Sequence, residues 1–584
     1  MTPTKFASIL RHQRRRLRSS EVALIALAVA VGLAAGLLTL IQGGLAHLVQ
    51  RLLYGAAIDR LSAVTAVDPL RLLALPLGGL VLAGISYATR GRQRAPIDVV
   101  EANALHGGVI PARDSLVVSA QTLVSNGAGA SVGLEAAYAQ MGGGVASIAG
   151  QWLKLRRNDL RTLVGAGAGA AVGAAFSAPL TGAFYAFEIV IGAYTPAAIA
   201  PVAAACIAAA VMIRSAGAAP YLIALPSGHA IETTDYLFYA ALGFACALAA
   251  IILMQAITAL ETNVRRLPIP DRWRPVAGGI LLMPLALLSP QTLSAGHGAL
   301  HLDLAVPLGL GTLAGIFFLK IAASAISLGF GFRGGMFFAS LFLGSLAGQM
   351  FALILAALPG APPIDPVDAA LVGMAAMAVA VVGGPMTMSM LVLESTHDFA
   401  LTAVAIAAAL CASTLVRETF GFSFSTWRLH TRGETIRSAR DIGWMRSLTA
   451  GRMMRRETPM VDADITIADF RHRFPLGSAG RIILTDGSGH YAGIVPTPLA
   501  FAASADPSAP VRTLAILADQ TLRPDEDVAA IMRRFEDLSA DEMVVVDPEG
   551  AVLGLVSEKY VRRRYAEELE KSQRELFGEA RESK

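Results

Sequence analysis

The sequence predicts an all-α polytopic membrane domain followed by a smaller soluble α/β domain. Of the 584 residues, 54% are hydrophobic and only 16% are charged, a balance too apolar for a protein surrounded by water. Several uncharged runs reach the roughly 20 residues that a helix needs to cross a bilayer. From about Arg432 charges become frequent and apolar runs shrink to strand length. We therefore expect a basic N-terminal segment at 1–20, a membrane domain at 21–432 and a soluble domain at 433–584.

The first uncharged run, Val22–Gln42, follows a cluster of arginines between residues 11 and 18. This run is too long for the apolar region of a signal peptide, so we interpret it as a retained first helix. Positive charge flanking a membrane helix favours the cytoplasmic side, which predicts a cytoplasmic N-terminus. The small net charge of +4 and the position of the basic clusters beside apolar runs give no indication of a nucleic-acid partner.

Later uncharged runs are interrupted by glycine and proline, or separated by a single acid. Non-helical backbone at membrane depth is tolerated only where it is buried in protein or lines a wet cavity, so these breaks indicate a transport pathway. The runs are Thr162–Phe187, Ile189–Ile213, Tyr236–Leu260, Gly334–Ile364, Ala369–Leu393 and Phe399–Val416.

The membrane part contains an internal repeat. Pro179 is followed nine residues later by Glu188, and Pro385 is followed nine residues later by Glu394. A glycine-led stretch precedes each proline at a similar distance. Paired interrupted segments in two halves are typical of transporters built from inverted repeats, with the binding site at their interface. The alternative is chance self-similarity in sequence rich in glycine and alanine.

Three glycine-led stretches, Gly107–Pro111, Gly133–Ala137 and Gly334–Phe338, each combine small residues with a plausible helix start. Helix N-termini present unpaired N–H groups and the positive end of the helix dipole, so several of them pointed at one spot would bind a small anion. None of the three stretches contains a lysine or arginine, and the resulting weak binding suits conduction. The sequence therefore predicts a small anion as substrate, with no metal and no cofactor.

Glu135 is an acid at the beginning of a predicted membrane helix, a position that is functional by default. Its carboxylate could occupy the place of the anion when ionised and leave it when protonated, and so act as a gate and a proton carrier. The alternative role is a first-turn glutamate that only complements the helix dipole.

At these residues the chain resembles the CLC family of chloride channels and proton-coupled anion antiporters, whose motifs GSGIP, GREGP and GGxFxP read here GGVIP, GLEAA and GGMFFA. The resemblance covers nearly the whole chain. It implies a homodimer with one pore per subunit, a tail of paired CBS domains at about 449–505 and 513–570, and Glu135 as gating glutamate. The anion-binding positions that it implies are Gly108, Val109, Ile110, Leu134, Glu135, Ala136, Phe337, Phe338 and Ser425.

Three departures from the family pattern bear on function. Gly108 stands where the family has an anion-coordinating serine, and Ser425 where it has a pore-lining tyrosine, so the inner constriction should be wider. Ile189 replaces the inner proton-relay glutamate of antiporters. These departures favour a channel or weak proton coupling, with a chloride/proton or fluoride/proton antiporter as the alternatives. Glu188 is interpreted as a structural cap on nearby backbone N–H groups.

The soluble tail contains two units, each with a helix, a strand, a turn and a second strand. The turns are predicted at Asp486–Gly489 and Asp547–Gly550. Family units that bind adenine nucleotides place an aspartate three residues after a Ser or Thr, and here Tyr560 follows Ser557, with Leu499 at the matching place of the first unit. A module without nucleotide is therefore at least as well supported as an ATP sensor.

Other function classes fit less well. An intramembrane hydrolase would need a nucleophile with a base, and the pairs His301 with Asp303 and His397 with Asp398 lack a nucleophile beside them. A purely regulatory membrane sensor would not need repeated broken helices. We therefore predict a protein that is not an enzyme, whose partners are chloride or another small anion, possible protons and the lipid bilayer. A bacterial inner membrane, with both termini cytoplasmic, is the expected location.

Overall fold

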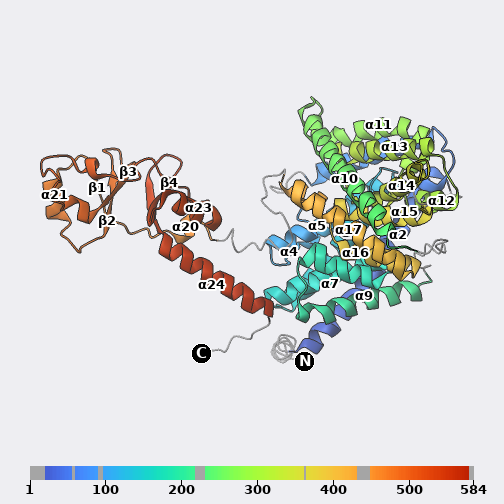
Figure 1. The fold of residues 1–584 in the computed structure, drawn as a ribbon, viewed down its shortest axis with the longest axis horizontal. Coiled ribbons are helices and arrows are strands. Elements are labelled where there is room, and N and C mark those ends of the chain that lie inside the picture. Colours follow the sequence, from blue (N-terminus) through green and yellow to red (C-terminus); the bar gives the residue numbers. More distant parts are fainter. Residues whose placement is uncertain are drawn as a thin grey trace. The chain divides into compact units, whose positions relative to one another are not determined.

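The computed structural model describes residues 20–55, 60–89, 96–217, 231–360, 364–430 and 448–577. The chain divides into two units, Met1–Asp441 and Ile442–Lys584. The first is helical and the second carries two small sheets (Figure 1). The arginine cluster before residue 20 and the predicted domain boundary at 432/433 lie outside the described residues.

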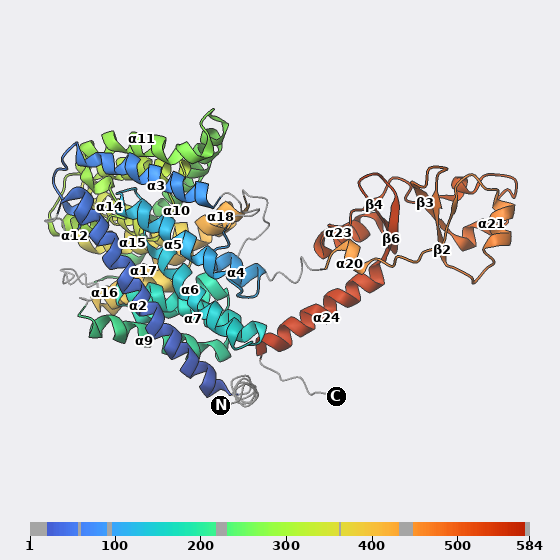
Figure 2. The same cartoon turned by 180° about the vertical axis from the view of Figure 1, so that it is seen from behind.

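Helices of very different length build the first unit, and Figure 2 shows them from behind. They are α2 (Glu21–Tyr54), α3 (Ala74–Ala88), α4 (Val99–Leu105), α5 (Ala112–Gly127), α6 (Glu135–Trp152), α7 (Arg157–Phe176), α8 (Pro179–Tyr185), α9 (Pro196–Ser215), α10 (Asp235–Arg266), α11 (Arg274–Leu288), α12 (His297–Ala305), α13 (Leu310–Gly329), α14 (Phe337–Ala356), α15 (Pro366–Val382), α16 (Pro385–Thr396), α17 (Phe399–Thr419) and α18 (Phe424–His430).

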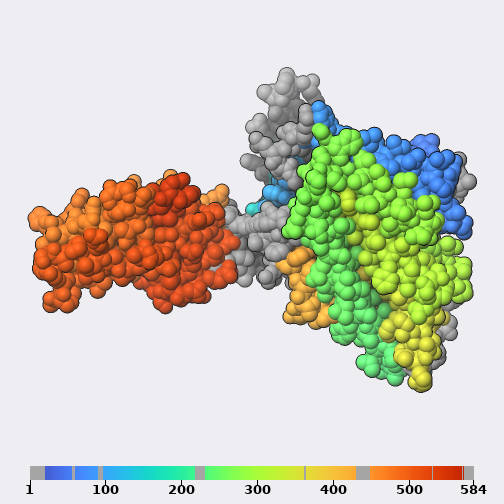
Figure 3. Space-filling view, turned by 90° about the horizontal axis from the view of Figure 1, so that it is seen from above, coloured from blue at the N-terminus to red at the C-terminus, as the bar shows by residue number. Residues whose placement is uncertain are grey.

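Seven helical segments among the described residues are long and apolar enough to cross a bilayer. In the space-filling view the green and yellow-green part of the chain, which includes α10 to α13, covers much of one face of this unit (Figure 3). On α10 the side chains of Leu248 and Ile252 are 56% and 64% exposed, as expected of a surface in contact with lipid. The protein is an integral membrane protein.

Two helix pairs at the centre pack with almost no side chain between them. A Cβ atom added to Gly142 of α6 would strike the carbonyl of Gly167 in α7, and one added to Gly167 would strike the carbonyl of Gly142. Gly344 of α14 and Gly373 of α15 have the same reciprocal relation. Small residues at such crossings let helix backbones approach closely, and here they place α7 and α15 in the buried core.

Two of the predicted uncharged runs form two helices each, separated at the expected prolines. Helix α7 ends before Ser177, which has a left-handed backbone (φ 52°), and α8 begins at Pro179. Helix α15 ends before Gly383 (φ 89°) and Gly384 (φ 75°), and α16 begins at Pro385. Proline at the first position of a helix loses no hydrogen bond, since that N–H is unpaired in any case. Helix α8 continues into a π-helical turn, η3 (Ala186–Ile191).

The second unit repeats one arrangement twice. In each sheet the first strand pairs parallel with the second, and the second pairs antiparallel with the third. The hairpins turn where the sequence predicted, before β3 and β6. The elements are α20 (Ala450–Met453), β1 (Met460–Asp462), α21 (Ile467–Arg473), β2 (Arg481–Thr485), β3 (Tyr491–Pro496), α22 (Thr497–Ala500), β4 (Thr521–Leu522), α23 (Val528–Leu538), β5 (Glu542–Val546), β6 (Val552–Ser557) and α24 (Glu558–Phe577).

Candidate functional site

Two helix starts that are far apart in the sequence are joined at the centre of the membrane unit. The Gly133 N–H donates to the Gly335 carbonyl at 2.9 Å, and the Gly335 N–H donates to the Gly133 carbonyl at 3.0 Å. Two residues beyond each glycine a helix begins, α6 at Glu135 and α14 at Phe337. The first N–H groups of a helix have no partner within it, so this bridge brings two sets of such donors together.

Glu135 lies at this bridge and is only 4% exposed. Its backbone N–H and that of Phe338 face the carboxylate, but neither completes a hydrogen bond of ordinary geometry, and both carboxylate oxygens are buried without a partner. A buried carboxylate with incomplete hydrogen bonding is costly, which makes Glu135 a candidate functional residue.

The glycines at the bridge are required by the position of this carboxylate. A Cβ atom on Gly335 would lie 3.2 Å from Glu135 Oε2 and 3.4 Å from the Ala136 backbone nitrogen, and a Cβ atom on Gly133 would collide with the carboxylate. The Glu135 side chain therefore lies over the starts of both helices, in the space that an anion bound to their N–H groups would occupy.

A row of aromatic rings passes through the site. His297 stacks on Phe338 with ring centroids 3.5 Å apart. Phe176 lies 6.1 Å from Phe338 and 5.2 Å from Phe337, and Phe337 lies 6.2 Å from Tyr185. The side chains at the α14 start are thus fixed by ring packing. The predicted residues Leu134, Glu135, Ala136, Phe337 and Phe338 are all at this place.

The third predicted helix start is not at this site, which corrects the interpretation of Gly107–Pro111. The Ile110 N–H donates to Ser147 Oγ at 2.8 Å, and that hydroxyl donates to the Gly108 carbonyl at 2.7 Å. Ser147 lies twelve residues beyond Glu135 on α6, which is roughly 18 Å along the helix. The assignment of Gly108, Val109 and Ile110 as anion ligands beside Glu135 is therefore wrong.

The two glycines have another purpose in the structure. Gly107 and Gly108 have φ angles of 62° and 85°, and the Gly108 N–H donates to the Ala102 carbonyl at 2.9 Å. This is the usual glycine termination of a helix, here α4, and it needs left-handed backbone rather than closeness to a ligand.

The start of α4 approaches the site instead, and the sequence analysis missed it. Gln140 Nε2 donates to the Ile97 carbonyl at 3.1 Å, only five residues along α6 from Glu135. Asp98 caps α4 by accepting from the Glu101 N–H at 2.8 Å. The signal was present, since an aspartate followed three residues later by a glutamate, just after Pro96, is a capping box.

Ile189 and Ser425 lie in another part of the membrane unit. A Cβ atom on Gly383 would be 3.6 Å from Ile189 Cδ1 and 4.0 Å from the Cβ of Ser423, which immediately precedes α18. Ser425 is the second residue of α18, next to the end of α15. Residue 189 is an isoleucine, so this position carries no ionisable side chain.

Glu188 and Glu394 cap each other's halves of the unit. Glu188 accepts from the Met386 and Thr387 N–H groups at 3.1 and 2.9 Å. Glu394 accepts from the Leu180 and Thr181 N–H groups, both at 2.8 Å. Each carboxylate also accepts from the threonine hydroxyl. The predicted capping role of Glu188 is confirmed, and Glu394 has the same role in the opposite direction.

A buried polar network supports the loop that leads to Glu135. Asn126 Nδ2 donates to the Val132 carbonyl at 2.8 Å and to Ser294 Oγ at 3.0 Å. Lys320, fully buried in α13, donates to the Ser294 and Thr292 carbonyls at 2.8 and 3.2 Å. Sequence reasoning also missed this lysine, although one ionisable residue in an apolar helix is a recognisable signal.

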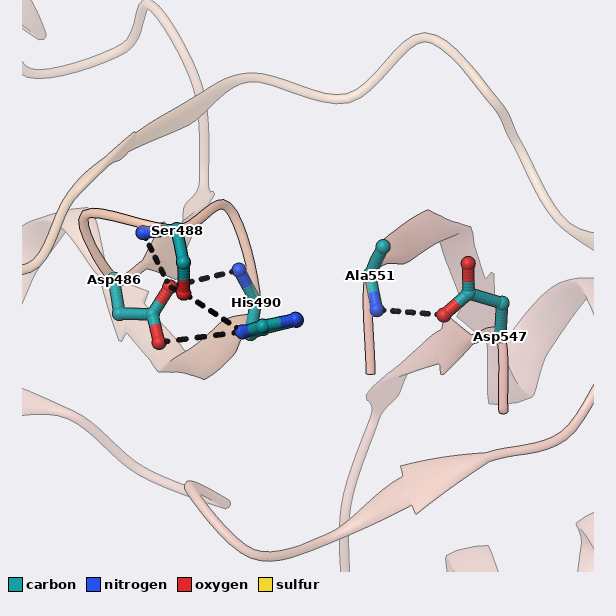
Figure 4. A network of polar contacts seen from close by, with 5 residues as sticks. All are labelled: Asp486, Ser488, His490, Asp547 and Ala551. Atoms are coloured by element: carbon teal, nitrogen blue, oxygen red, sulfur yellow. Dashed lines mark hydrogen bonds and ion pairs between the residues drawn. The ribbon is translucent and has the colours of Figure 1, made fainter. Parts of the chain in front are cut away.

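In the tail, Ser557 and Tyr560 line a cavity of about 350 Å³ together with Arg452, Arg455 and Glu542. The two hairpin turns of the tail meet through a bridge between His490 and Ala551, and their side-chain contacts are shown in Figure 4. No group of three potential metal ligands occurs within the described ranges.

Residues 78–417 match the model of a family described as voltage gated chloride channel. A ClcB-like chloride channel protein of Ralstonia nicotianae is 30% identical over 384 residues, which are 64% of this chain and 89% of that protein. Among solved structures, a slow cyanobacterial Cl⁻/H⁺ antiporter is 22% identical with a TM-score of 0.60, covering 70% of this chain and 97% of its own. A CLC-type fluoride/proton antiporter is 20% identical with a TM-score of 0.57, covering 68% and 96%. The chain therefore belongs to the voltage-gated chloride channel family, the CLC family.

Proposed function

We propose that the protein conducts chloride across a membrane through a CLC-type pathway that Glu135 gates. The observation that carries the proposal is the buried carboxylate lying over the joined starts of α6 and α14 without a hydrogen-bond partner. When ionised, it occupies the positive ends of two helices and excludes the anion. When protonated, it loses that attraction, and chloride binds to the same N–H groups.

The backbone N–H groups of Glu135, Ala136, Phe337 and Phe338 are the proposed anion donors. Backbone dipoles bind an anion more weakly than a fixed lysine would, and weak binding permits release and conduction. Ser425 is proposed to line the inner part of the pathway. The resemblance of Gly108 to the family's serine position contributes nothing to the proposal, because the Gly108 N–H already donates to the Ala102 carbonyl.

Proton coupling is proposed to be weak. Glu135 can carry a proton to and from the anion site, but Ile189 cannot relay one from the inner side. A chloride/proton or a fluoride/proton antiporter is the alternative, and the likeness in fold to a CLC-type fluoride/proton antiporter supports testing fluoride.

The reciprocal caps of Glu188 and Glu394 support the proposal that the two halves are inverted repeats. The exposed apolar side chains of Ile199, Ile207 and Val211 on α9 would suit a homodimer interface. We also propose that the tail is a CBS pair that tunes transport from the cytoplasm without a nucleotide, and that the protein resides in a bacterial inner membrane with both termini inside.

The test is reconstitution in liposomes, with chloride efflux and proton movement recorded together for wild type and Glu135→Gln. We expect chloride flux in both, with any proton movement abolished in the variant. The matched control is Glu261→Gln, which removes a carboxylate that pairs with Arg265 on α10 and should change neither flux. Uphill proton movement driven by chloride would identify an antiporter. Absence of chloride flux with retained fluoride flux would contradict the chloride proposal.

A further inference from the structure

His297 is a polar side chain that lies between solvent and the joined helix starts. Its ring stacks on Phe338, the second residue of α14, with the ring centroids 3.5 Å apart and an angle of 19° between the planes. Glu135 and Phe338 are buried, whereas His297 is partly exposed. Within the described residues neither ring nitrogen of His297 makes a hydrogen bond, and neither is enclosed. The imidazole therefore presents its polar edge to solvent, one ring away from the site.

The backbone that carries His297 is fixed on both sides. After it, Ser62 Oγ accepts hydrogen bonds from the Gly298 N–H at 3.0 Å and from the next N–H at 3.2 Å, and so caps the start of α12. Before it, Lys320 Nζ donates to the Ser294 carbonyl at 2.8 Å. With its backbone held by these contacts and its ring held by stacking, the imidazole loses little conformational freedom when it binds a ligand.

The contacts of the segment 292–297 place His297 near the end of α2. Ser294 Oγ accepts from Gln50 Nε2 at 3.3 Å, and Gln50 lies one helical turn before Tyr54, the last residue of α2. Helix α2 is long enough to cross the bilayer, and its start is proposed to be cytoplasmic. His297 then lies toward the outer face, so an anion arriving from outside would meet it before the joined helix starts.

The imidazole offers a donor of a kind that the neighbours of Glu135 in the chain lack. These neighbours, Leu134 and Ala136, have apolar side chains. A neutral imidazole carries one N–H donor in either tautomer, so it can bind an anion without changing its protonation state. Such a donor holds an anion less tightly than the fixed charge of a lysine would, which suits conduction.

We propose that His297 is a further anion-binding residue, whose ring N–H donates to the anion on the outer side of the joined helix starts. Stacking on Phe338 keeps this donor next to the backbone N–H groups of α14. The inference rests on the proposed function, because it adds a side-chain donor to the same anion site. It involves no proton transfer, and it is therefore independent of how strongly transport is coupled to protons.

The experiment measures chloride binding to the full-length protein in detergent by calorimetry. The background is Glu135→Gln, in which no carboxylate charge competes for the site. His297→Phe keeps an aromatic ring against Phe338 and removes both nitrogens, and His297→Leu removes them with a smaller side chain in case the first variant melts early. His297→Gln restores an N–H donor. The matched control is His472→Phe, which removes the imidazole of an exposed histidine on α21.

The measurements are made at about pH 8, where an imidazole with the ordinary pKa of about 6.5 is neutral, so they test the donor and not a charge. We expect His297→Phe and His297→Leu to weaken chloride binding about tenfold, the effect of losing one hydrogen bond to an ion. His297→Gln should recover most of the affinity, and His472→Phe should stay within about twofold of the background.

Unchanged affinity in His297→Phe would overturn the inference and leave the proposed function intact, and a loss in His297→Gln alone would then assign the ring a packing role. Chloride flux is recorded separately in liposomes. Its absence in wild type would contradict the proposed conduction, whereas the calorimetric affinities would still decide the role of His297. Absence of chloride binding in the background would overturn both.

Discussion

The segments α6–α8 and α14–α16 share one frame but carry different side chains at the site. Gly142 and Gly344 stand seven residues after the first residue of α6 and of α14, and both make backbone contacts with the following helix. Their partners, Gly167 and Gly373, each stand twelve residues before the proline that starts the next helix. The shared glycines fix the geometry, and the two segments differ in the residue at which the helix begins, Glu135 in one and Phe337 in the other.

The largest expected effect comes from breaking the shared frame. Gly142→Leu and Gly344→Leu each force a side chain into the backbone of the neighbouring helix. Overpacking a core typically lowers the free energy of unfolding by about 1–3 kcal/mol. We expect each variant to lose at least the upper end of that range, which is enough to prevent recovery of folded protein. The control is Gly311→Leu, since no atom lies within 4 Å of a Cβ at that glycine. Size-exclusion profiles in detergent measure the outcome. A folded Gly142→Leu protein beside an unfolded Gly344→Leu protein would contradict the equivalence of the two crossings.

The next comparison separates the roles of Glu135 and Phe337, the first residues of α6 and α14. Glu135→Ala should remove gating and raise chloride flux, because the carboxylate no longer competes with the anion. Phe337→Ala leaves the backbone donors in place, so gating should persist. Loss of the buried ring should lower the free energy of unfolding by about 3–5 kcal/mol. Flux assays at several pH values, together with melting in detergent, distinguish these results. Loss of gating in both variants would mean that packing, and not the carboxylate, closes the site.

A smaller effect is expected from removing the reciprocal caps, in which Glu188 and Glu394 each cap a helix of the other half. Glu188→Ala and Glu394→Ala each leave two backbone N–H groups without their partner in the other half. We expect each to lower stability by about 1–2 kcal/mol, similar to the loss of other helix caps. Melting curves of the two variants should nearly coincide. Glu418→Ala, which removes an exposed glutamate of α17, is the control. A loss confined to one of the two caps would show that the halves do not depend on each other equally.

The smallest effect is expected in the tail, where Asp486 and Asp547 occupy matching turns (Figure 4). The Ser488 hydroxyl, with the His490 and Ser488 N–H groups, lowers the pKa of Asp486 from its ordinary 3.8 to about 2. A carboxyl whose pKa is lower in the folded state stabilises that state above its ordinary pKa. Its contribution is lost as the pH falls from about 4 to about 2. Hydrogen exchange of β2 and β3 in the full-length protein should show this change in wild type and not in Asp486→Asn, with Asp525→Asn as the control.

Sequence patterns predicted much of the fold because the signals are local. The breaks at Pro179 and Pro385, the tail hairpins and the position of Glu135 at a helix start each follow from a few neighbouring residues. The error at Gly107–Pro111 arose because glycine serves two purposes, approach to a ligand and left-handed backbone at a helix end. Only the contact of Ile110 with Ser147 distinguishes the two. The bridge between Gly133 and Gly335 and the Lys320 network could not be predicted, since they depend on contacts between distant segments.

The exchange of caps between the two halves has a consequence for synthesis of the chain. Glu394 lies 214 residues after Leu180, and its carboxylate accepts a hydrogen bond from the Leu180 N–H group. At translation rates of about 5–20 residues per second, the first half exists for roughly 10–40 s before that carboxylate has been made. During this interval the start of α8 lies in or near the bilayer without its final partner. Glu188, in contrast, already exists when α16 emerges. The first half therefore matures last, and a nascent chain that stops before Glu394 can complete neither half.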